Sequence, residues 1–97
     1  KPEFNQKFSD HLRLKGVSNE IIQKIQNKIV NLNKEVSEED TLGKGFTIGH
    51  SYFTPTEQVE DSEEWYKTII DNEIAPLLRE YYFDDEKKAE DLIAELY

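Results

Sequence analysis

The amino-acid sequence predicts a mainly α-helical fold, a small bundle of about four helices with a short extended segment near residues 45–53. Apolar residues recur every three or four positions through most of the 97-residue chain, which is the spacing of one helical face. Only residues 46–53 alternate with a period of two, which is typical of an extended segment. A chain of this length forms one domain, so we expect residues 1–97 to be a single helical domain.

The composition excludes several classes of protein and site. Cysteine is absent, which removes disulfides, thiolate zinc sites and thiol nucleophiles together. No apolar run approaches the roughly 18 residues of a transmembrane helix, and no signal peptide opens the chain. We therefore expect a cytoplasmic protein without a membrane partner. Methionine is also absent and the chain begins Lys1-Pro2, so we expect a fragment of a larger protein.

The charge is unevenly distributed along the chain. Residues 1–34 hold seven basic and three acidic residues, a net charge of +4, whereas residues 35–97 hold five and eighteen, a net charge of −13. The total of −9 repels phosphate backbones, which argues against independent binding to nucleic acid. The basic first third is either a solvated helix face or a surface for an acidic neighbour.

The first predicted helix covers about residues 3–15. Phe4, Phe8 and Leu12 lie four residues apart and share one helical face. Gly16 follows, at the place where a left-handed residue ends a helix.

The second predicted helix covers about residues 19–36 and has the most regular apolar pattern in the chain. Ser18 stands where an N-cap is expected. The apolar positions step by three and four, which indicates a core-facing stripe: Ile22, Ile25, Ile29, Leu32 and Val36.

The stretch 42–53, LGKGFTIGHSYF, differs from everything around it. It holds three of the four glycines, at Gly43, Gly45 and Gly49, and glycine is costly inside regular structure. The alternation from Phe46 onward predicts the short extended segment, which Pro55 ends. If the chain has a functional site, we expect it in this stretch.

A third helix is predicted over about residues 62–83. Asp61 and Glu64 have the spacing of a capping box, and the apolar residues then repeat every four positions. Pro76 falls inside this pattern and removes one backbone hydrogen bond, so we expect a kink or a break just before it.

The last predicted helix covers about residues 86–97. Asp84 and Asp85 precede it as candidate N-caps. Its apolar positions are Ala89, Leu92, Ile93 and Leu96.

No catalytic or metal-binding motif is complete in this chain. The spacing around Gly43, Lys44, Gly45 and Gly49 fits neither the Walker A loop nor the dinucleotide-binding pattern. His50-Ser51 lacks the context of a nucleophile elbow, and two isolated histidines do not form a zinc motif. We therefore expect no catalytic residue and no metal site in the fragment, and no cofactor for the fragment alone.

Three stretches together resemble a known family. GKGFTIGHSYF (43–53) and EEWYKTIIDNEIAPLLREYYFDD (63–85) closely resemble the C-terminal segment of McrB-type AAA+ proteins, the B subunits of 5-methylcytosine-specific restriction enzymes. VSNEIIQKIQNKIVNLNKEV (17–36) is similar to the long helix that precedes these motifs in the family. The resemblance covers roughly residues 12–97.

The resemblance implies that the chain is the C-terminal helical lid of a nucleotide-hydrolysing subunit. Such a lid closes over GTP, or ATP, bound with Mg by an upstream AAA+ large domain. It also implies neighbouring motor subunits in a ring, a McrC-like nuclease subunit, and contact with DNA through the full complex only. The parent protein is then a GTPase or NTPase subunit of a restriction endonuclease.

The resemblance also implies a candidate nucleotide-proximal site. By position, the region where an AAA+ lid can present a sensor residue corresponds to Gly49, His50, Ser51 and Tyr52. No arginine stands there, so a standard sensor arginine is absent. Backbone groups or His50 then either touch the nucleotide or fix the loop.

A different class of function explains the amphipathic helices equally well. A stand-alone helical module that binds a partner protein needs the same apolar stripes and no nucleotide chemistry. It leaves the glycine-histidine-aromatic stretch unexplained.

Overall fold

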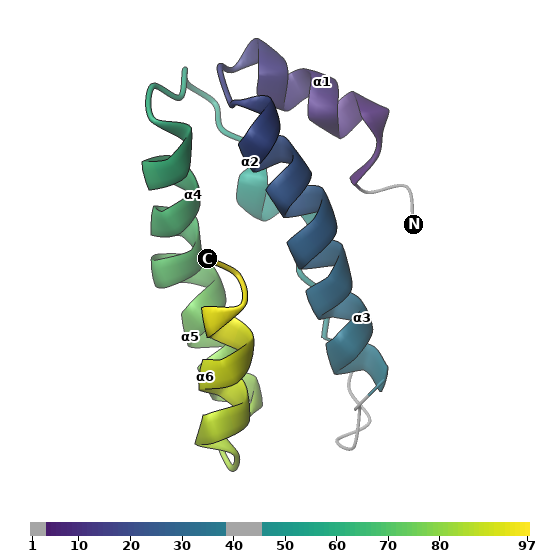
Figure 1. Ribbon diagram of the computed structural model, residues 1–97, viewed down its shortest axis with the longest axis vertical. Helices are drawn as coiled ribbons and strands as arrows, with labels where there is room; N and C mark the ends of the chain where they lie inside the picture. Colours follow the sequence, from purple (N-terminus) through teal and green to yellow (C-terminus); the bar gives the residue numbers. More distant parts are fainter. Residues whose placement is uncertain (1–3, 39–45) are drawn as a thin grey trace.

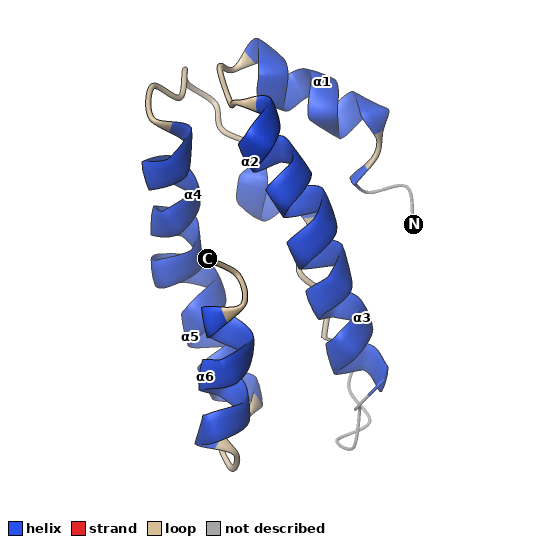
Figure 2. Cartoon of the chain, in the orientation of Figure 1, coloured by secondary structure: helices blue, strands red, loops and turns tan. Residues whose placement is uncertain are grey.

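The computed structural model describes residues 4–38 and 46–97 and confirms the predicted helical bundle (Figure 1). Within these residues helices alternate with loops and turns, and no strand occurs (Figure 2). Gly43 and Gly45, in the first part of the stretch 42–53, lie outside the described residues.

Two long helical rods run side by side and form the body of the molecule (Figure 1). The first rod, residues 19–38, joins α2 (Asn19–Lys24), a π-helical turn (Ile25–Ile29) and α3 (Val30–Glu38). The second rod, residues 62–81, joins α4 (Ser62–Ile69), a π-helical turn (Ile70–Ile74) and α5 (Ala75–Tyr81).

Two shorter helices complete the bundle. α1 (Gln6–Leu14) crosses one end of the first rod, and α6 (Glu86–Ala94) folds back along α5 (Figure 1). The chain that connects the two rods passes behind the first rod and contains a short 3₁₀ helix, η3 (His50–Phe53).

The helix ends carry the caps that the sequence predicts. The side chains of Ser18, Asp61 and Asp85 each accept a hydrogen bond from the backbone N–H three residues later, at 3.2–3.3 Å. Gly16 has φ +92°, and a Cβ there would come within 2.9 Å of the Val59 carbonyl oxygen. Glycine is therefore required both by the left-handed backbone and by the close approach of the connecting chain.

Some helix bounds differ from those that the sequence predicts. α1 begins at Gln6 because Asn5 is its N-cap and accepts a hydrogen bond from the Phe8 N–H at 3.2 Å. α6 ends at Ala94, not at residue 97, because the chain turns there and buries Leu96. α5 ends at Tyr81, two residues before the predicted limit.

The second rod does not break at Pro76. The helical residues run from Ser62 to Tyr81, and the distortion is the π-helical turn directly before α5, where the Ala75 N–H donates to the Ile70 carbonyl five residues earlier. Pro76 then falls in the first turn of α5, where a missing N–H costs little.

The predicted extended segment near residues 45–53 is only partly correct. Gly49 is extended, with φ −86° and ψ 171°, but residues 50–53 form η3. A strand needs a neighbouring strand to satisfy its backbone groups, and none is present among the described residues. At Ile48 the side chain of Asn33 supplies those hydrogen bonds instead.

One apolar core joins all these elements. Both rods, α1, α6 and the connecting chain contribute buried side chains to it: Phe8, Leu12, Ile22, Ile25, Ile29, Leu32, Val36, Ile48, Phe53, Tyr66, Ile70, Ile74, Leu78, Leu92, Ile93 and Leu96. No helix formed by the described residues is both long and apolar enough to cross a membrane.

Candidate functional site

The four candidate site residues form a short exposed turn, Gly49–Tyr52, which we call the histidine turn. His50 and Ser51 are exposed, whereas Gly49 and Tyr52 are half-buried. The turn closes with a hydrogen bond from the Tyr52 N–H to the Gly49 carbonyl oxygen at 3.4 Å. The structure thus places all four residues together at the start of η3.

Buried residues hold the histidine turn on both flanks. Ile48 is 1% exposed and Phe53 is 0% exposed. The Phe53 ring stacks on Tyr66 of the second rod, with ring centroids 6.1 Å apart. Because both flanks are fixed in the core, the exposed residues between them have a defined position.

The first rod holds the peptide groups that precede the turn. Asn33 donates from Nδ2 to the Ile48 carbonyl oxygen at 3.0 Å, and its Oδ1 accepts from the Ile48 N–H at 2.7 Å. One side chain therefore satisfies both backbone groups of a buried residue, as a neighbouring strand would.

The other side of the histidine turn is α1. The His50 ring lies edge-on to Phe8, with centroids 6.2 Å apart and an interplanar angle of 80°. Phe8 in turn makes an edge-on contact with Phe4 at 5.1 Å. Offset and edge-on arrangements of this kind are the favoured ones for aromatic pairs, so the position of His50 is coupled to α1.

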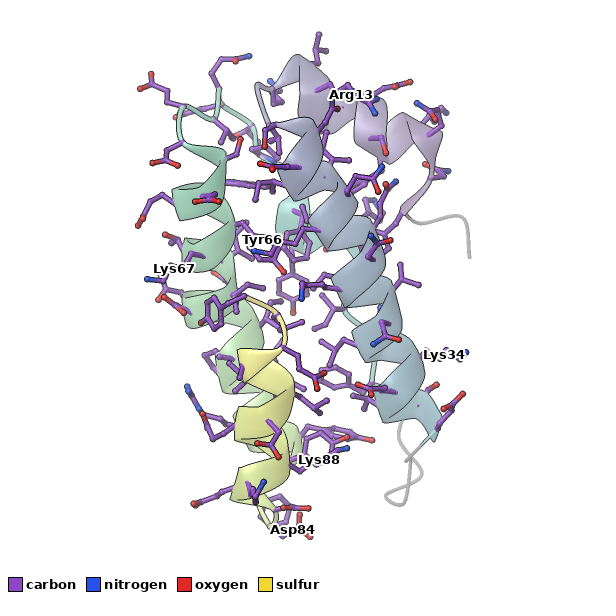
Figure 3. All side chains as sticks on the ribbon, in the orientation of Figure 1. Arg13, Lys34, Tyr66, Lys67, Asp84 and Lys88 are labelled. Atoms are coloured by element: carbon purple, nitrogen blue, oxygen red, sulfur yellow. The ribbon has the colours of Figure 1, made fainter. Side chains whose placement is uncertain are left out.

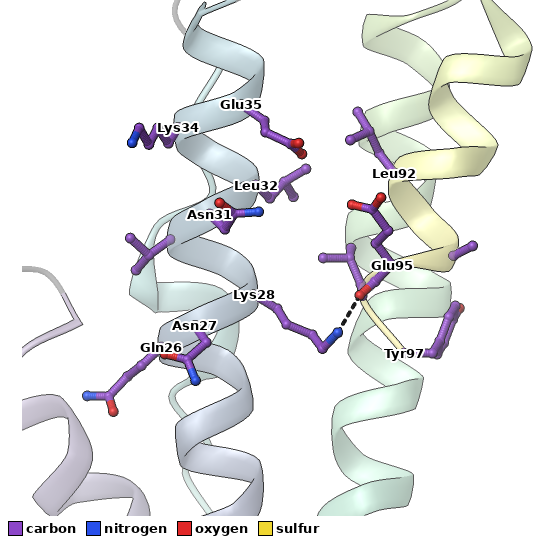
Figure 4. Close-up of a pocket in the computed structure, with 13 residues that line it drawn as sticks. Gln26, Asn27, Lys28, Asn31, Leu32, Lys34, Glu35, Leu92, Glu95 and Tyr97 are labelled. Carbon is purple, nitrogen blue, oxygen red and sulfur yellow. Dashed lines mark hydrogen bonds between the residues drawn. The ribbon is translucent and has the colours of Figure 1, made fainter.

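A second amide of the first rod holds α1 itself. Gln26 donates from Nε2 to the Ser9 hydroxyl at 2.7 Å and to the Phe4 carbonyl oxygen at 3.2 Å. Ser9 is buried and donates onward to the Asn5 carbonyl oxygen at 3.3 Å. Figure 4 shows Gln26 on the side of the rod that faces α1.

The histidine turn presents polar groups at the surface of the molecule. It offers an imidazole, a hydroxyl and backbone groups, which donate and accept hydrogen bonds. Within residues 4–38 and 46–97 no three His, Asp or Glu side chains gather closely enough to hold a metal ion.

Apart from the histidine turn, the surface has a hollow between the first rod and α6. It is an open groove of about 750 Å³ lined by charged residues of both signs, by apolar side chains such as Leu32 and Leu92, and by the C-terminal end of the chain (Figure 4). Lys28 crosses it and donates to the Glu95 carbonyl oxygen at 2.7 Å. This hydrogen bond connects the two sides of the groove, the first rod and the end of α6.

Sequence reasoning missed Asn33 and Gln26, although a signal for them exists. Each stands four residues after one buried isoleucine and three before the next buried apolar residue, which places an amide on the edge of the core-facing stripe. A polar residue with that spacing must find hydrogen-bond partners inside the fold. The sequence shows the spacing of these two amides, but it does not show which groups they bind.

The comparisons with known proteins agree with this architecture. The family model described as "McrB, alpha-helical lid domain" matches residues 24–90, a range that contains the histidine turn, Asn33 and Gln26. The chain is also similar to the type IV methyl-directed restriction enzyme EcoKMcrB subunit of Escherichia coli (strain K12), with 40% identity over 84 residues. That match covers 84% of this chain and 18% of the relative.

Proposed function

This chain belongs to the McrB alpha-helical lid family, and on that premise we propose that it closes over the nucleotide of a McrB-like AAA+ motor subunit. The parent subunit would hydrolyse GTP, or ATP, with Mg on an upstream large domain. The lid would supply contacts and movement rather than reacting groups, so the fragment alone would not be an enzyme.

The observation that carries this proposal is the exposed histidine turn held rigidly beside α1. His50 packs on Phe8 of α1, and α1 is the first helix of the described chain. In the proposed parent protein, the large domain would precede α1 in the sequence. A histidine and a serine presented there would offer hydrogen bonds to phosphate or ribose oxygens.

The proposed mechanism is conformational. Lids of this kind move as rigid bodies, and the bound nucleotide shifts their docking on the large domain and on a neighbouring subunit. One continuous core joins both rods, α1 and α6, which suits movement of the lid as a unit. The further partners would be the other motor subunits of a ring, a McrC-like nuclease subunit, and DNA through the full complex in the cytoplasm.

The family match favours the lid over the alternative of a stand-alone interaction module. A free-standing module leaves the glycine-histidine-aromatic stretch unexplained. The discriminating observation is a Walker A loop upstream of this segment in the same coding frame, which the lid requires and the stand-alone module does not.

The His50→Ala variant of the full-length protein tests the proposed site. We expect it to weaken nucleotide affinity by about tenfold, because a hydrogen bond to a charged ligand is lost. The helical circular dichroism should be unchanged, because His50 is exposed. Titration with GTP and with ATP, in separate experiments, measures the affinity and identifies the preferred nucleotide.

The second histidine of the chain provides the control. His11 lies on α1 outside the histidine turn, so His11→Ala should leave nucleotide affinity unchanged. Normal affinity and turnover in His50→Ala would make His50 a structural residue and would overturn the proposed contact.

A further inference from the structure

Two amide side chains of the first rod hold the two sides of the histidine turn. Asn33 binds both peptide groups of Ile48, directly before Gly49. Gln26 binds the Phe4 carbonyl oxygen and Ser9, and so fixes α1 behind the His50–Phe8 contact. The same helical rod therefore determines where His50 lies and what it packs against.

The two amides share one face of the rod. They are seven residues apart, which is about two turns and about 10 Å along a helix. Each follows a fully buried or nearly buried isoleucine by four residues, Ile22 for Gln26 and Ile29 for Asn33. A shift of the rod along or about its axis thus moves both amides, and with them both sides of the turn.

The carboxamide of Asn33 suits this task, and only glutamine carries the same group. A peptide group needs one donor and one acceptor, and a carboxamide supplies both from a single planar group. Aspartate would place a carboxylate oxygen against the Ile48 carbonyl oxygen, and leucine would leave both backbone groups unpaired. Since Ile48 is buried, an unpaired peptide group there is costly.

We propose that Asn33 and Gln26 are positioning residues that set the presentation of His50 to the nucleotide and couple it to the orientation of the first rod. The functional half of this inference rests on the proposed nucleotide-lid function. Neither residue would itself touch the nucleotide: both would act through the histidine turn.

Hydrogen–deuterium exchange of the full-length protein tests the positioning without reference to nucleotide. In Asn33→Leu, backbone amides within residues 46–53 should exchange about tenfold faster, because the Ile48 N–H loses its acceptor. Asn33→Asp keeps an acceptor for that N–H, so its exchange should stay closer to that of the wild type. Asn31→Leu and Gln23→Glu, at exposed positions of the same rod, are the matched controls and should leave these amides protected.

A double-mutant cycle on nucleotide KM tests the functional half. Asn33→Leu should raise KM by a factor similar to that of His50→Ala, and the double variant should be no worse than either one, because Asn33 acts through His50. Gln26→Leu should have a smaller effect in the same direction, and Asn31→Leu should have none. Helical circular dichroism identifies any variant that fails to fold, in which case Asn33→Ala, which also removes both amide contacts, replaces Asn33→Leu in the cycle.

The outcomes separate this inference from the proposed function. If His50→Ala raises KM and folded Asn33 variants keep the wild-type KM, the positioning role is overturned and the nucleotide contact stands. If Asn33→Leu loosens residues 46–53 but neither it nor His50→Ala changes KM, the proposed nucleotide contact is overturned. Unchanged exchange in Asn33→Leu overturns the positioning role directly.

Discussion

At the scale of single residues, Tyr66 shows how one side chain joins the two rods. Its ring lies between them (Figure 3), with the Lys24 ammonium 5.2 Å from the ring centroid. Its hydroxyl donates to the Leu96 carbonyl oxygen at 2.8 Å. Burial raises the pKa of Tyr66 above its ordinary value, since the charged phenolate is disfavoured there.

A second tyrosine, Tyr97, connects the C-terminal end of the chain to the second rod. The Tyr97 hydroxyl donates to the Asp71 carboxylate. Burial, and then this hydrogen bond to an anion, raise the pKa of Tyr97 to about 12. Both phenols are therefore held neutral in the folded state.

These shifts predict a loss of stability at alkaline pH. Because the folded-state pKa of Tyr66 is raised, its contribution is fully present below the unfolded pKa of about 10 and is lost as pH rises above that value. Tyr66→Phe should flatten this alkaline decline. At neutral pH it should cost about 1 kcal/mol, because the buried Leu96 carbonyl loses its donor.

Urea unfolding between about pH 7 and about pH 11 measures both effects. An alkaline slope as steep in Tyr66→Phe as in the wild type would show that other groups cause the decline. Lysines titrate in the same pH range. The contribution of Tyr66 is therefore measured by the difference in slope between the wild type and Tyr66→Phe.

Single residues also mark what the sequence could and could not predict. Ser18, Asp61 and Asp85 act through a backbone N–H three residues away, so local spacing was sufficient to predict them as caps. Asn33 binds a residue fifteen positions later in the chain. That contact depends on how the connecting chain crosses the rod, which local spacing does not determine.

At the scale of elements, the π-helical turn of the second rod follows from the spacing of its apolar residues. Tyr66, Ile70, Ile74 and Leu78 lie four residues apart and are all at most 2% exposed. On a regular α-helix each step of four residues overshoots a full turn by about 40°, so four such residues drift out of line. A π-helical turn takes up an extra residue and keeps the stripe directed toward the core.

The π-helical turn of the second rod also accommodates Pro76. In a regular α-helix the proline ring would clash with the carbonyl four residues earlier. Deletion of Asn72, an exposed residue inside the turn, should restore a regular helix and bring back that clash. We expect a loss of about 3 kcal/mol of stability.

The double change provides the decisive comparison. Pro76→Ala alone should have a small effect, because the proline occupies the first turn of α5, where it is tolerated. Adding Pro76→Ala to the Asn72 deletion should recover most of the lost stability, measured by chemical unfolding. If the Asn72 deletion costs the same stability with and without the proline, the π-helical turn does not serve to accommodate Pro76.

The helices were predictable as elements because each carries its own periodic stripe and its own cap. The histidine turn was less so. Its alternation of apolar and polar residues predicts an extended segment, yet residues 50–53 form η3, with Ile48 and Phe53 buried on either side of the exposed residues. Such a short alternation is compatible with both conformations, and only the absence of a partner strand among the described residues decides between them.

At the scale of the whole molecule, several lysines of the basic first third make contacts within the bundle itself. Lys24 lies over the Tyr66 ring and Lys28 binds the Glu95 carbonyl oxygen. Lys15 donates likewise to the Thr56 carbonyl oxygen at 3.1 Å. Reversing Lys24 or Lys28 would disturb the bundle itself, so these residues are poor probes of a docking surface.

Lys7 and Lys34 are the sharper probes, because both are exposed and Lys34 points away from the bundle (Figure 3). If the basic first third of the chain docks on an acidic surface of a neighbouring motor subunit, Lys7→Glu with Lys34→Glu should weaken assembly of the full-length protein. Sedimentation measures this. The loss should be largest at low salt, because exposed charges are screened as ionic strength rises.

Lys67→Glu is the matched control, since Lys67 is exposed on the second rod and its reversal changes the net charge by the same amount per site. It should leave assembly unchanged if the docking surface lies on α1 and the first rod. Equal weakening by Lys67→Glu would indicate that total charge, and not a localised surface, governs assembly. Unchanged assembly in the Lys7/Lys34 variant would leave the basic third as a solvated face that also makes internal contacts, such as those of Lys15, Lys24 and Lys28.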